Sequence, residues 1–113
     1  MKLYIYRGLD GERVPKDVTR VIVDSSVTVS KEMAFLECKY LVCVIMGDNV
    51  KRIEKRAFRW CLALRFIRLS KILEYIGELA FCYCESLEAL FLPSTVKSIG
   101  QVLSINEIAD SAK

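Results

Sequence analysis

A short motif of four residues recurs three times along the chain at a constant interval. Each copy begins with an Ala-Phe pair, followed by a cysteine and then a leucine, and the copies start at Ala34, Ala57 and Ala80. A period between about 20 and 50 residues is the signature of a solenoid, in which each unit buries its apolar face only by stacking on the next. The repeat therefore predicts a stack of similar coils, an architecture that presents extended surfaces for recognition.

Composition supports a single folded domain and limits the kinds of partner. The chain has 113 residues, of which 53% are apolar and 27% charged, and this balance favours a packed core over disorder. Its formal net charge of +3 permits an acidic partner. That charge falls short of the strongly basic surface typical of nucleic-acid binders, so we do not expect a nucleic acid as the partner.

Several functional classes are disfavoured by features that the sequence lacks. The chain contains no histidine, which removes the commonest general base and the usual nitrogen ligand of zinc, so we expect no enzymatic activity, no metal and no cofactor. No apolar run reaches the ~18 residues of a membrane span, and the first residues lack the apolar core of a signal peptide. Five cysteines, an odd number, indicate reduced thiols, and these features together predict a cytoplasmic protein.

Each unit divides into an extended half and a half with helical spacing. In 23-residue units counted from Val18, the fourth and sixth positions are apolar, which places them on one face of a short strand. Later in the second unit, Ile53, Ala57 and Cys61 recur at intervals of four, which predicts about two turns of helix. The predicted fold is an α/β solenoid of about four right-handed coils, with a parallel sheet on one face and short helices on the other.

The repeated aromatic and sulfur positions are expected to form columns inside this stack. The phenylalanines of the motif should stack as a buried aromatic column, and the cysteines should behave as a column of small apolar groups. The aromatic column consists of Phe35, Phe58 and Phe81, and the cysteine column consists of Cys38, Cys61 and Cys84.

The full pattern, L..v.l…V..Ig..AF..C..L, is complete between Leu64 and Leu87 and resembles the leucine-rich repeats of the BspA-like class. The resemblance covers roughly residues 18–100. It departs from the family pattern at Ser30, where an isoleucine is usual, and a continuous asparagine ladder is absent: the corresponding residues are Ser26, Asn49, Ile72 and Thr95. The resemblance implies a leucine-rich-repeat solenoid with protein-interaction and surface-recognition roles, and it supplies no catalytic residues.

A solenoid needs caps, because its terminal units would otherwise expose their core. Residues 1–17 are predicted to form the first cap as a short strand or hairpin, followed by the solenoid at 18–102. In residues 103–113, Ser104 and Glu107 form a capping box ahead of apolar residues at helical spacing, which predicts a closing helix. The alternative is a truncated repeat, in which case the chain is a fragment of a longer recognition array.

The solvent-facing side of the predicted strands carries an apolar set of side chains with arginines beside them. Aromatic and arginine residues together are typical of the anchors of protein interfaces, so we expect Phe66 and Phe91 to act as apolar anchors. The predicted partner-binding residues are Ile45, Phe66, Arg68, Phe91, Arg65 and Cys43. We therefore predict a non-enzymatic module that binds a protein of unknown identity through this face, with a homodimer through the same face as the alternative.

Two further features have both a structural and a functional interpretation. The basic run at 51–59 interrupts the buried positions at helical spacing, which is typical of a solvated face, and its alternative is a binding surface for an acidic or phosphate-bearing ligand. Cys82 and Cys84 have the spacing of a metal or redox pair, but Cys84 already belongs to the cysteine column. Cys43 lies off that column and is expected to be the most reactive thiol.

Overall fold

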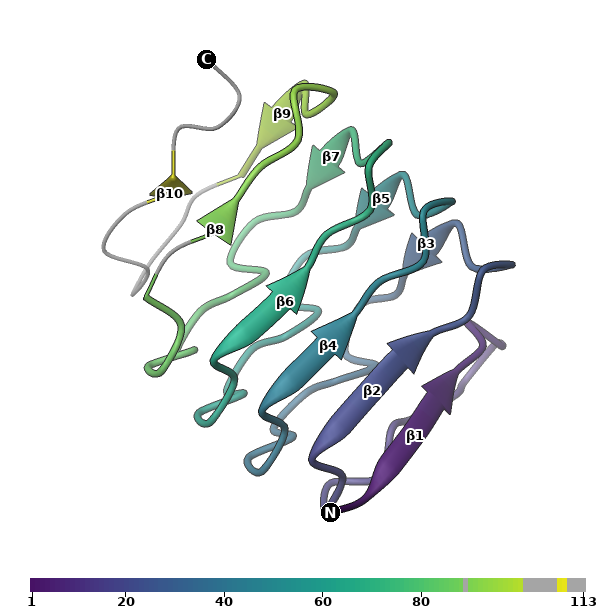
Figure 1. Cartoon of the computed structure of the whole chain (residues 1–113), viewed down its shortest axis with the longest axis vertical. Coiled ribbons are helices and arrows are strands. Elements are labelled where there is room, and N and C mark those ends of the chain that lie inside the picture. Colours follow the sequence, from purple (N-terminus) through teal and green to yellow (C-terminus); the bar gives the residue numbers. More distant parts are fainter. Residues whose placement is uncertain (89, 101–107, 110–113) are drawn as a thin grey trace.

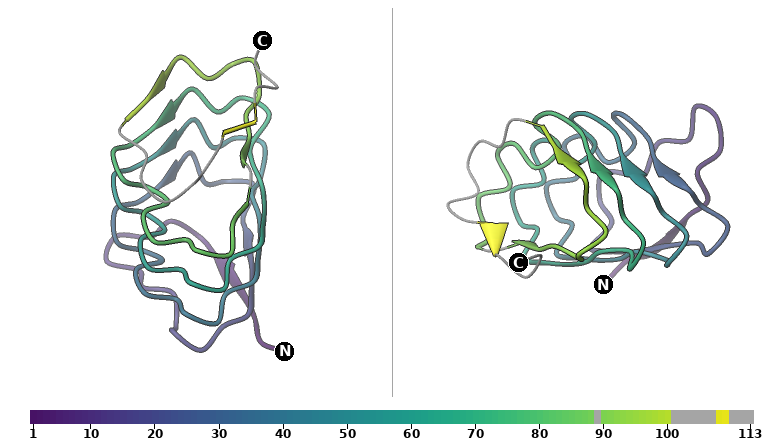
Figure 2. Two further views of the ribbon diagram at one scale, coloured as in Figure 1. Left: turned by 90° about the vertical axis from the view of Figure 1, so that its left-hand side faces the viewer. Right: turned by 90° about the horizontal axis from the view of Figure 1, so that it is seen from above.

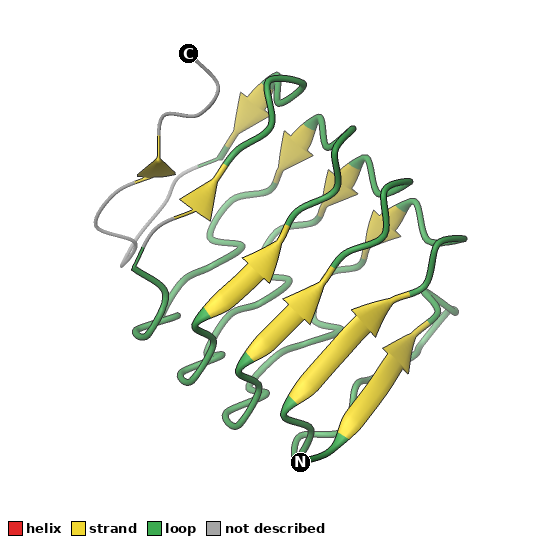
Figure 3. Cartoon of the chain, viewed as in Figure 1, coloured by secondary structure: helices red, strands yellow, loops and turns green. Residues whose placement is uncertain are grey.

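The chain folds as a parallel β-solenoid whose strands are joined by turns (Figure 3). The computed structural model describes residues 1–88, 90–100 and 108–109. Within these residues there are ten strands and no helix. The strands are β1 (Leu3–Tyr6), β2 (Arg20–Val23), β3 (Val29–Ser30), β4 (Cys43–Ile45), β5 (Arg52–Ile53), β6 (Phe66–Arg68), β7 (Tyr75–Ile76), β8 (Leu90–Phe91), β9 (Ser98–Ile99) and β10 (Ile108–Ala109).

Two parallel sheets line different sides of the coil (Figure 1). Sheet A contains β1, β2, β4 and β6 in that order, and sheet B contains β3, β5, β7 and β9. Arg20 pairs with Cys43 and Cys43 pairs with Phe66, so neighbouring repeat strands are offset by one period of the sequence motif. Ile53 pairs with Ile76 at the same interval in sheet B. One period of the sequence is therefore one complete coil, and equivalent segments lie above one another in the stack (Figure 2).

The side of the coil that the spacing predicts to be helical is instead a series of turns. Arg56 and Trp60 have φ values of 57° and 68°, and a right-handed helix does not accommodate such left-handed residues. The same pair of positive φ values recurs at Leu79 and Tyr83. The predicted short helices are therefore wrong in the described part of the chain. Tight turns also bring residues four positions apart to one side, which is why the spacing resembled that of a helix.

Hydrogen bonds between neighbouring coils make these turns regular. Alternate backbone amides of one coil donate to alternate carbonyl oxygens of the next. The bonds run from Arg56 to Glu78, from Phe58 to Ala80 and from Trp60 to Cys82, with N···O distances of 3.0, 2.8 and 3.0 Å. Backbone amides that a helix would pair internally are thus satisfied by a third ladder along the stack.

The described chain makes about three turns of the solenoid, not the four that were predicted. The complete coils begin with β2, β4 and β6, and each contributes one strand to sheet A and one to sheet B. A further unit begins with β8 and β9 and is described as far as Gly100, apart from residue 89. The first three repeats counted in the sequence each form a complete coil, and only part of the last repeat lies among the described residues.

The segment predicted as a closing helix, residues 103–113, lies mostly outside the described residues. Ile108–Ala109 is described and forms β10, which pairs in parallel with β8, so a helix is wrong at these two residues. Ile108 pairs with Leu90. These two residues are closer in sequence than Cys43 and Phe66, which pair across one full period of the repeat. For the rest of the segment the closing helix and the truncated repeat stay predictions.

Columns of identical side chains fill the core, as the repeat predicted. Phe35, Phe58 and Phe81 are buried, with ring centroids 4.6 and 5.4 Å apart and interplanar angles of 17° and 0°. Tyr6 of β1 adds a fourth ring, 4.9 Å from Phe35, and is itself fully buried. The N-terminal segment thus continues the aromatic column beyond the first complete coil.

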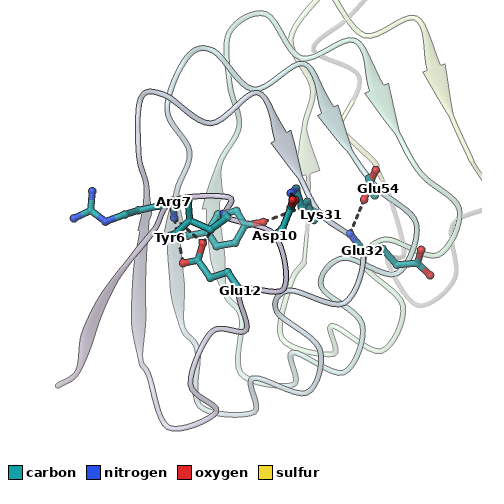
Figure 4. Close-up of polar contacts among 8 residues, drawn as sticks. Tyr6, Arg7, Asp10, Glu12, Lys31, Glu32 and Glu54 are labelled. Atoms are coloured by element: carbon teal, nitrogen blue, oxygen red, sulfur yellow. Dashed lines mark hydrogen bonds and ion pairs between the residues drawn. The ribbon is translucent and has the colours of Figure 1, made fainter.

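Polar contacts hold this N-terminal cap over the first coil (Figure 4). The cap is a strand, β1, paired in parallel with β2 and followed by a loop. The backbone amide of Lys31 donates to the Tyr6 hydroxyl, and Lys31 Nζ lies 2.7 Å from Asp10 Oδ1. The Glu12 carboxylate in the loop accepts a hydrogen bond from the Arg7 amide. It also accepts one from the hydroxyl of Tyr4 on β1. The loop is therefore attached both to the strand before it and to the first coil.

Ser30 stands at an inward position of sheet B that isoleucine occupies in the next coils, at Ile53 and Ile76. Its side chain is fully buried, and its Oγ has no hydrogen-bond partner among the described residues. We expect Ser30→Ala to raise the free energy of unfolding by about 1 kcal/mol, because the substitution removes a hydroxyl that is desolvated without compensation. Urea denaturation of the two proteins measures this difference.

Ser70→Ala is the matched control, since Ser70 is equally buried but its Oγ accepts a hydrogen bond from the Ile72 amide at 3.3 Å. Removing that acceptor should lower the free energy of unfolding by about 1 kcal/mol. Opposite signs for the two serines are the expected result, and a similar loss in both would show that the Ser30 hydroxyl is satisfied.

Candidate functional site

The outer face of sheet A carries two rows of side chains that the strand register sets. Cys43 lies beside Phe66 in the first row, and Ile45 lies beside Arg68 in the second. β1 extends the rows in one direction, and β8 follows β6 in the stack in the other (Figure 1). The large exposed apolar side chains of these strands are Leu3 (54% exposed), Ile5 (42%), Ile22 (39%), Phe66 (53%) and Phe91 (71%). Large apolar side chains are thus exposed on β1, β2, β6 and β8, whereas Cys43 and Ile45 of the intervening strand β4 are partly buried.

A hollow of about 330 Å³ lies at the β8 end of this face. Phe66 and Phe91 both line it, and Arg65 and Glu88 place a positive and a negative charge at its margin. Aromatic walls with charged groups beside them suit an apolar anchor flanked by polar contacts. The structure therefore brings together three of the predicted residues: Phe66, Phe91 and Arg65.

The other predicted residues are less available to a partner. Cys43 and Ile45 are only half-exposed. The Arg68 guanidinium reaches back toward the preceding coil, where Nη1 donates to the Met46 carbonyl at 3.1 Å and Nη2 lies 3.4 Å from Asp48 Oδ2. Arg68 thus anchors the loop that follows β4, and the exposed Arg65 is the freer of the two arginines.

The basic run at 51–59 does not form a single charged surface. Arg52 lies on β5, with its guanidinium carbon 4.4 Å from the centroid of the Tyr75 ring. Arg59 lies in the turns, 5.9 Å from the centroid of the Trp60 ring. The positive charges are divided between sheet B and the turns, which supports the interpretation of a solvated surface.

Neither a metal centre nor a membrane span stands out in the described residues. Cys82 and Cys84 are both buried, and across residues 1–88 and 90–100 no three potential ligands from His, Cys, Asp and Glu gather in one place. The same part of the chain contains no helix with the length and hydropathy needed to cross a membrane.

A comparison with models of protein families agrees with this architecture. The model described as "BspA type Leucine rich repeat region (6 copies)" matches residues 15–107, which is most of the chain. The chain belongs to the BspA-type leucine-rich repeat family. The resemblance predicted from the sequence pattern is thereby confirmed. A search of curated proteins found no match.

Solved structures with the same fold come from bacterial leucine-rich repeat proteins. A leucine-rich repeat protein of Bacteroides capillosus is 26% identical, with a TM-score of 0.77 over 90% of this chain and 88% of that one. One from Bacteroides ovatus is 31% identical, with a TM-score of 0.72 over 81% of this chain. A leucine-rich cell surface protein of Faecalibacterium prausnitzii is 22% identical, with a TM-score of 0.75 over 90% of this chain. This chain spans 36% of the Faecalibacterium protein and 25% of the Bacteroides ovatus protein.

The BspA-type repeat accounts for the buried positions and leaves other surfaces free to differ. Two groups of exposed residues were missed by reading the sequence as repeats. Leu3 and Ile5 lie on β1 at the edge of this face, and their alternation with polar or aromatic neighbours is the signal that places them on one side of a strand. Trp60 and Tyr83 occupy equivalent places in successive repeats and stack with ring centroids 4.1 Å apart, and that equivalence was the available signal.

In this BspA-type solenoid the cysteine column is a buried set of hydrogen-bond donors. The Sγ of Cys61 donates to the Phe35 carbonyl at 3.2 Å, and the Sγ of Cys84 donates to the Phe58 carbonyl at 3.1 Å. Burial raises the pKa of the Cys38 thiol to about 11 and that of Cys84 to about 12, and it also raises the pKa of Cys61. These thiols therefore serve packing and coil-to-coil bonding, and they are poor nucleophiles at neutral pH.

These raised pKa values predict that the fold loses stability in alkaline solution. The thiols ionise near pH 9 in the unfolded chain but stay protonated in the folded one up to about pH 11 or 12. Because the folded state then binds more protons, the free energy of unfolding should fall as the pH rises above about 9. Urea midpoints at pH 7 and pH 10 under reducing conditions test this, and Cys61→Ala should show a shallower fall. A midpoint unchanged between these pH values would contradict burial of the column.

Proposed function

We propose that this chain is a protein-binding module that engages its partner through the outer face of sheet A. The observation that carries the proposal is the series of exposed apolar side chains that runs along this face from Leu3 to Phe91. Scattered apolar residues on a surface need no explanation, but several large apolar side chains gathered on one face of a sheet favour an interface. Leucine-rich repeats in general are interaction modules, which agrees with this reading.

The hollow beside β6 and β8 is the proposed centre of the interface. Phe66 and Phe91 would bury large areas of apolar surface when covered, and aromatic residues of this kind carry much of the binding energy of interfaces. Arg65, exposed at the margin, would pair with an acidic or carbonyl group of the partner. Arg68 would contribute indirectly, by fixing the loop after β4 through Met46 and Asp48.

A paired capture experiment tests this proposal. Wild-type chain and the Phe66→Glu/Phe91→Glu double variant are immobilised and exposed to a lysate of the source organism. Both positions are exposed, so the double variant should fold, which circular dichroism and a thermal melt verify. We expect proteins bound by the wild type to be lost from the double variant, because two carboxylates would have to be desolvated at the centre of the interface.

The matched control places the same two charges on the side of sheet B. Thr28→Glu/Ser98→Glu changes exposed residues, one directly before β3 and one on β9, and should capture the same proteins as the wild type. If all three baits capture the same set, the outer face of sheet A is not the binding surface. If the wild type instead sediments as a dimer and the Phe66→Glu/Phe91→Glu variant as a monomer, the partner is a second copy of the chain.

A further inference from the structure

Positions 37, 60 and 83 occupy equivalent places in three successive coils. Glu37, Trp60 and Tyr83 have φ values of 58°, 68° and 64°, so all three are left-handed. The Glu37 amide donates to the Arg59 carbonyl and the Trp60 amide donates to the Cys82 carbonyl, both at 3.0 Å. Because the backbone conformation and its coil-to-coil bonding repeat, the three side chains leave the stack in the same direction.

Two of these side chains form a stacked aromatic pair, and the third position lacks a ring. Trp60 and Tyr83 stack with centroids 4.1 Å apart and planes 15° apart, and each is more than a third exposed. At Glu37 a hollow of about 430 Å³ opens, lined by Glu37, Lys39, Trp60 and Leu62. This volume falls within the range of roughly 300–1,000 Å³ that small-molecule sites occupy. The hollow is therefore a gap in the outer column of side chains at positions 37, 60 and 83, and the Trp60 ring bounds it.

The hollow combines apolar walls with one hydrogen-bond acceptor and one donor. Trp60 and Leu62 supply the apolar walls, the Glu37 carboxylate can accept, and the Lys39 ammonium can donate. Neither charged group has a hydrogen-bond or ion-pair partner in the described part of the chain. An aromatic ring placed in the hollow would desolvate both groups without satisfying either, which is costly. A cationic ligand is disfavoured by Lys39 and by the Arg59 guanidinium, 5.9 Å from the Trp60 centroid.

We propose that this hollow binds one pyranose ring of a glycan, which stacks on Trp60 and takes the ring position that this outer column lacks at Glu37. The C–H face of a pyranose is apolar, and the hydroxyl groups around it both donate and accept hydrogen bonds. One sugar ring can thus contact the indole, donate to Glu37 and accept from Lys39 at the same time. The site lies on the turns, separate from the outer face of sheet A, and does not depend on the protein binding proposed there.

Fluorescence tests the proposal directly, because Trp60 is the only tryptophan in the chain. Cellotetraose, chitotetraose and mannotetraose are titrated into the full chain up to about 10 mM, which detects a site with a Kd near 1 mM. At least one of them should change the Trp60 emission saturably. Saturation-transfer NMR then compares variants, and Trp60→Ala should weaken binding at least about tenfold, whereas Trp60→Phe, which keeps a ring, should retain most of it.

Two further variants separate this site from the rest of the surface. Glu37→Gln should weaken sugar binding, because the amide is a poorer acceptor than the carboxylate, and Phe66→Ala on sheet A should leave binding unchanged. The proposal is overturned if none of the three sugars alters the emission, or if Trp60→Ala binds as tightly as the wild type. It is also overturned if N-acetyltyrosinamide binds saturably and the sugars do not, since the occupant would then be an aromatic side chain.

Discussion

Replacing Phe58 with alanine is expected to lower the free energy of unfolding by about 3–5 kcal/mol. Phe58 is fully buried and stands at the middle of the aromatic column, with Phe35 4.6 Å away on one side and Phe81 5.4 Å away on the other. Both neighbours would border the resulting cavity, and the backbone cannot collapse into it because the Phe58 amide is bonded to the Ala80 carbonyl at 2.8 Å. The midpoint of thermal unfolding should fall by roughly 10 °C or more.

Phe66→Ala provides the control for this prediction, since it makes the same chemical change on the outer face of sheet A. Phe66 is 53% exposed, so its loss should change the free energy of unfolding by less than about 1 kcal/mol. Equal losses for the two variants, or a loss below about 1 kcal/mol for Phe58→Ala, would contradict the central position of the column in the core.

Gly77→Ala is expected to cost about 3 kcal/mol of stability, although it adds only one methyl group. A Cβ atom at Gly77 would lie 2.7 Å from the carbonyl carbon of Glu54 and 2.8 Å from Cα of Lys55, both backbone atoms of the preceding coil. The coils cannot move apart locally without breaking the bond from the Gly77 amide to the Ile53 carbonyl, which is 2.7 Å long. The substitution should therefore weaken sheet B beside β7, and urea denaturation measures the loss.

Gly47→Ala separates this steric effect from the general effect of replacing glycine. A Cβ atom at Gly47 would approach Ser25 Cα and the Val23 carbonyl oxygen no closer than 3.1 Å, so a small shift would suffice. Both substitutions restrict the unfolded chain to the same degree. Gly47→Ala should thus lower the free energy of unfolding by about 1 kcal/mol or less. If Gly77→Ala proves as stable as Gly47→Ala, the coils are spaced too widely for the backbone clash at Gly77.

The repeat allowed the core of the fold to be predicted, because burial depends on a period that the sequence displays. Phe58 and Cys61 were placed correctly in columns for that reason. The helix expected around them was wrong because the backbone takes left-handed values at Arg56 and Trp60, and neither residue type signals such a conformation. A left-handed turn can be predicted from the sequence where glycine or asparagine occupies it. Here Arg56 and Trp60 occupy the left-handed positions, and the stacking of the coils holds the backbone in that conformation.

The candidate binding face was predictable in outline, since the register of parallel strands follows from the repeat. Phe66 and Phe91 are exposed at the positions that this register assigns to the outer face. The engagement of Arg68 with Asp48 could not be foreseen, because the contact joins different coils at positions that the repeat does not align. The hollow beside Trp60 could not be predicted from the repeat either, since it depends on which side chain the preceding coil places next to the ring.

The most direct test of partner binding on sheet A is the rate at which Cys43 reacts with iodoacetamide, with and without the captured partner. Cys43 lies beside Phe66 on that face, and Cys38, Cys61, Cys82 and Cys84 are buried, so labelling of the native chain should report Cys43 alone. Alkylation of Cys43 should slow markedly when the partner is bound, and the Phe66→Glu/Phe91→Glu variant should show no slowing. A rate that stays the same in the complex would place the partner elsewhere and contradict the proposed interface.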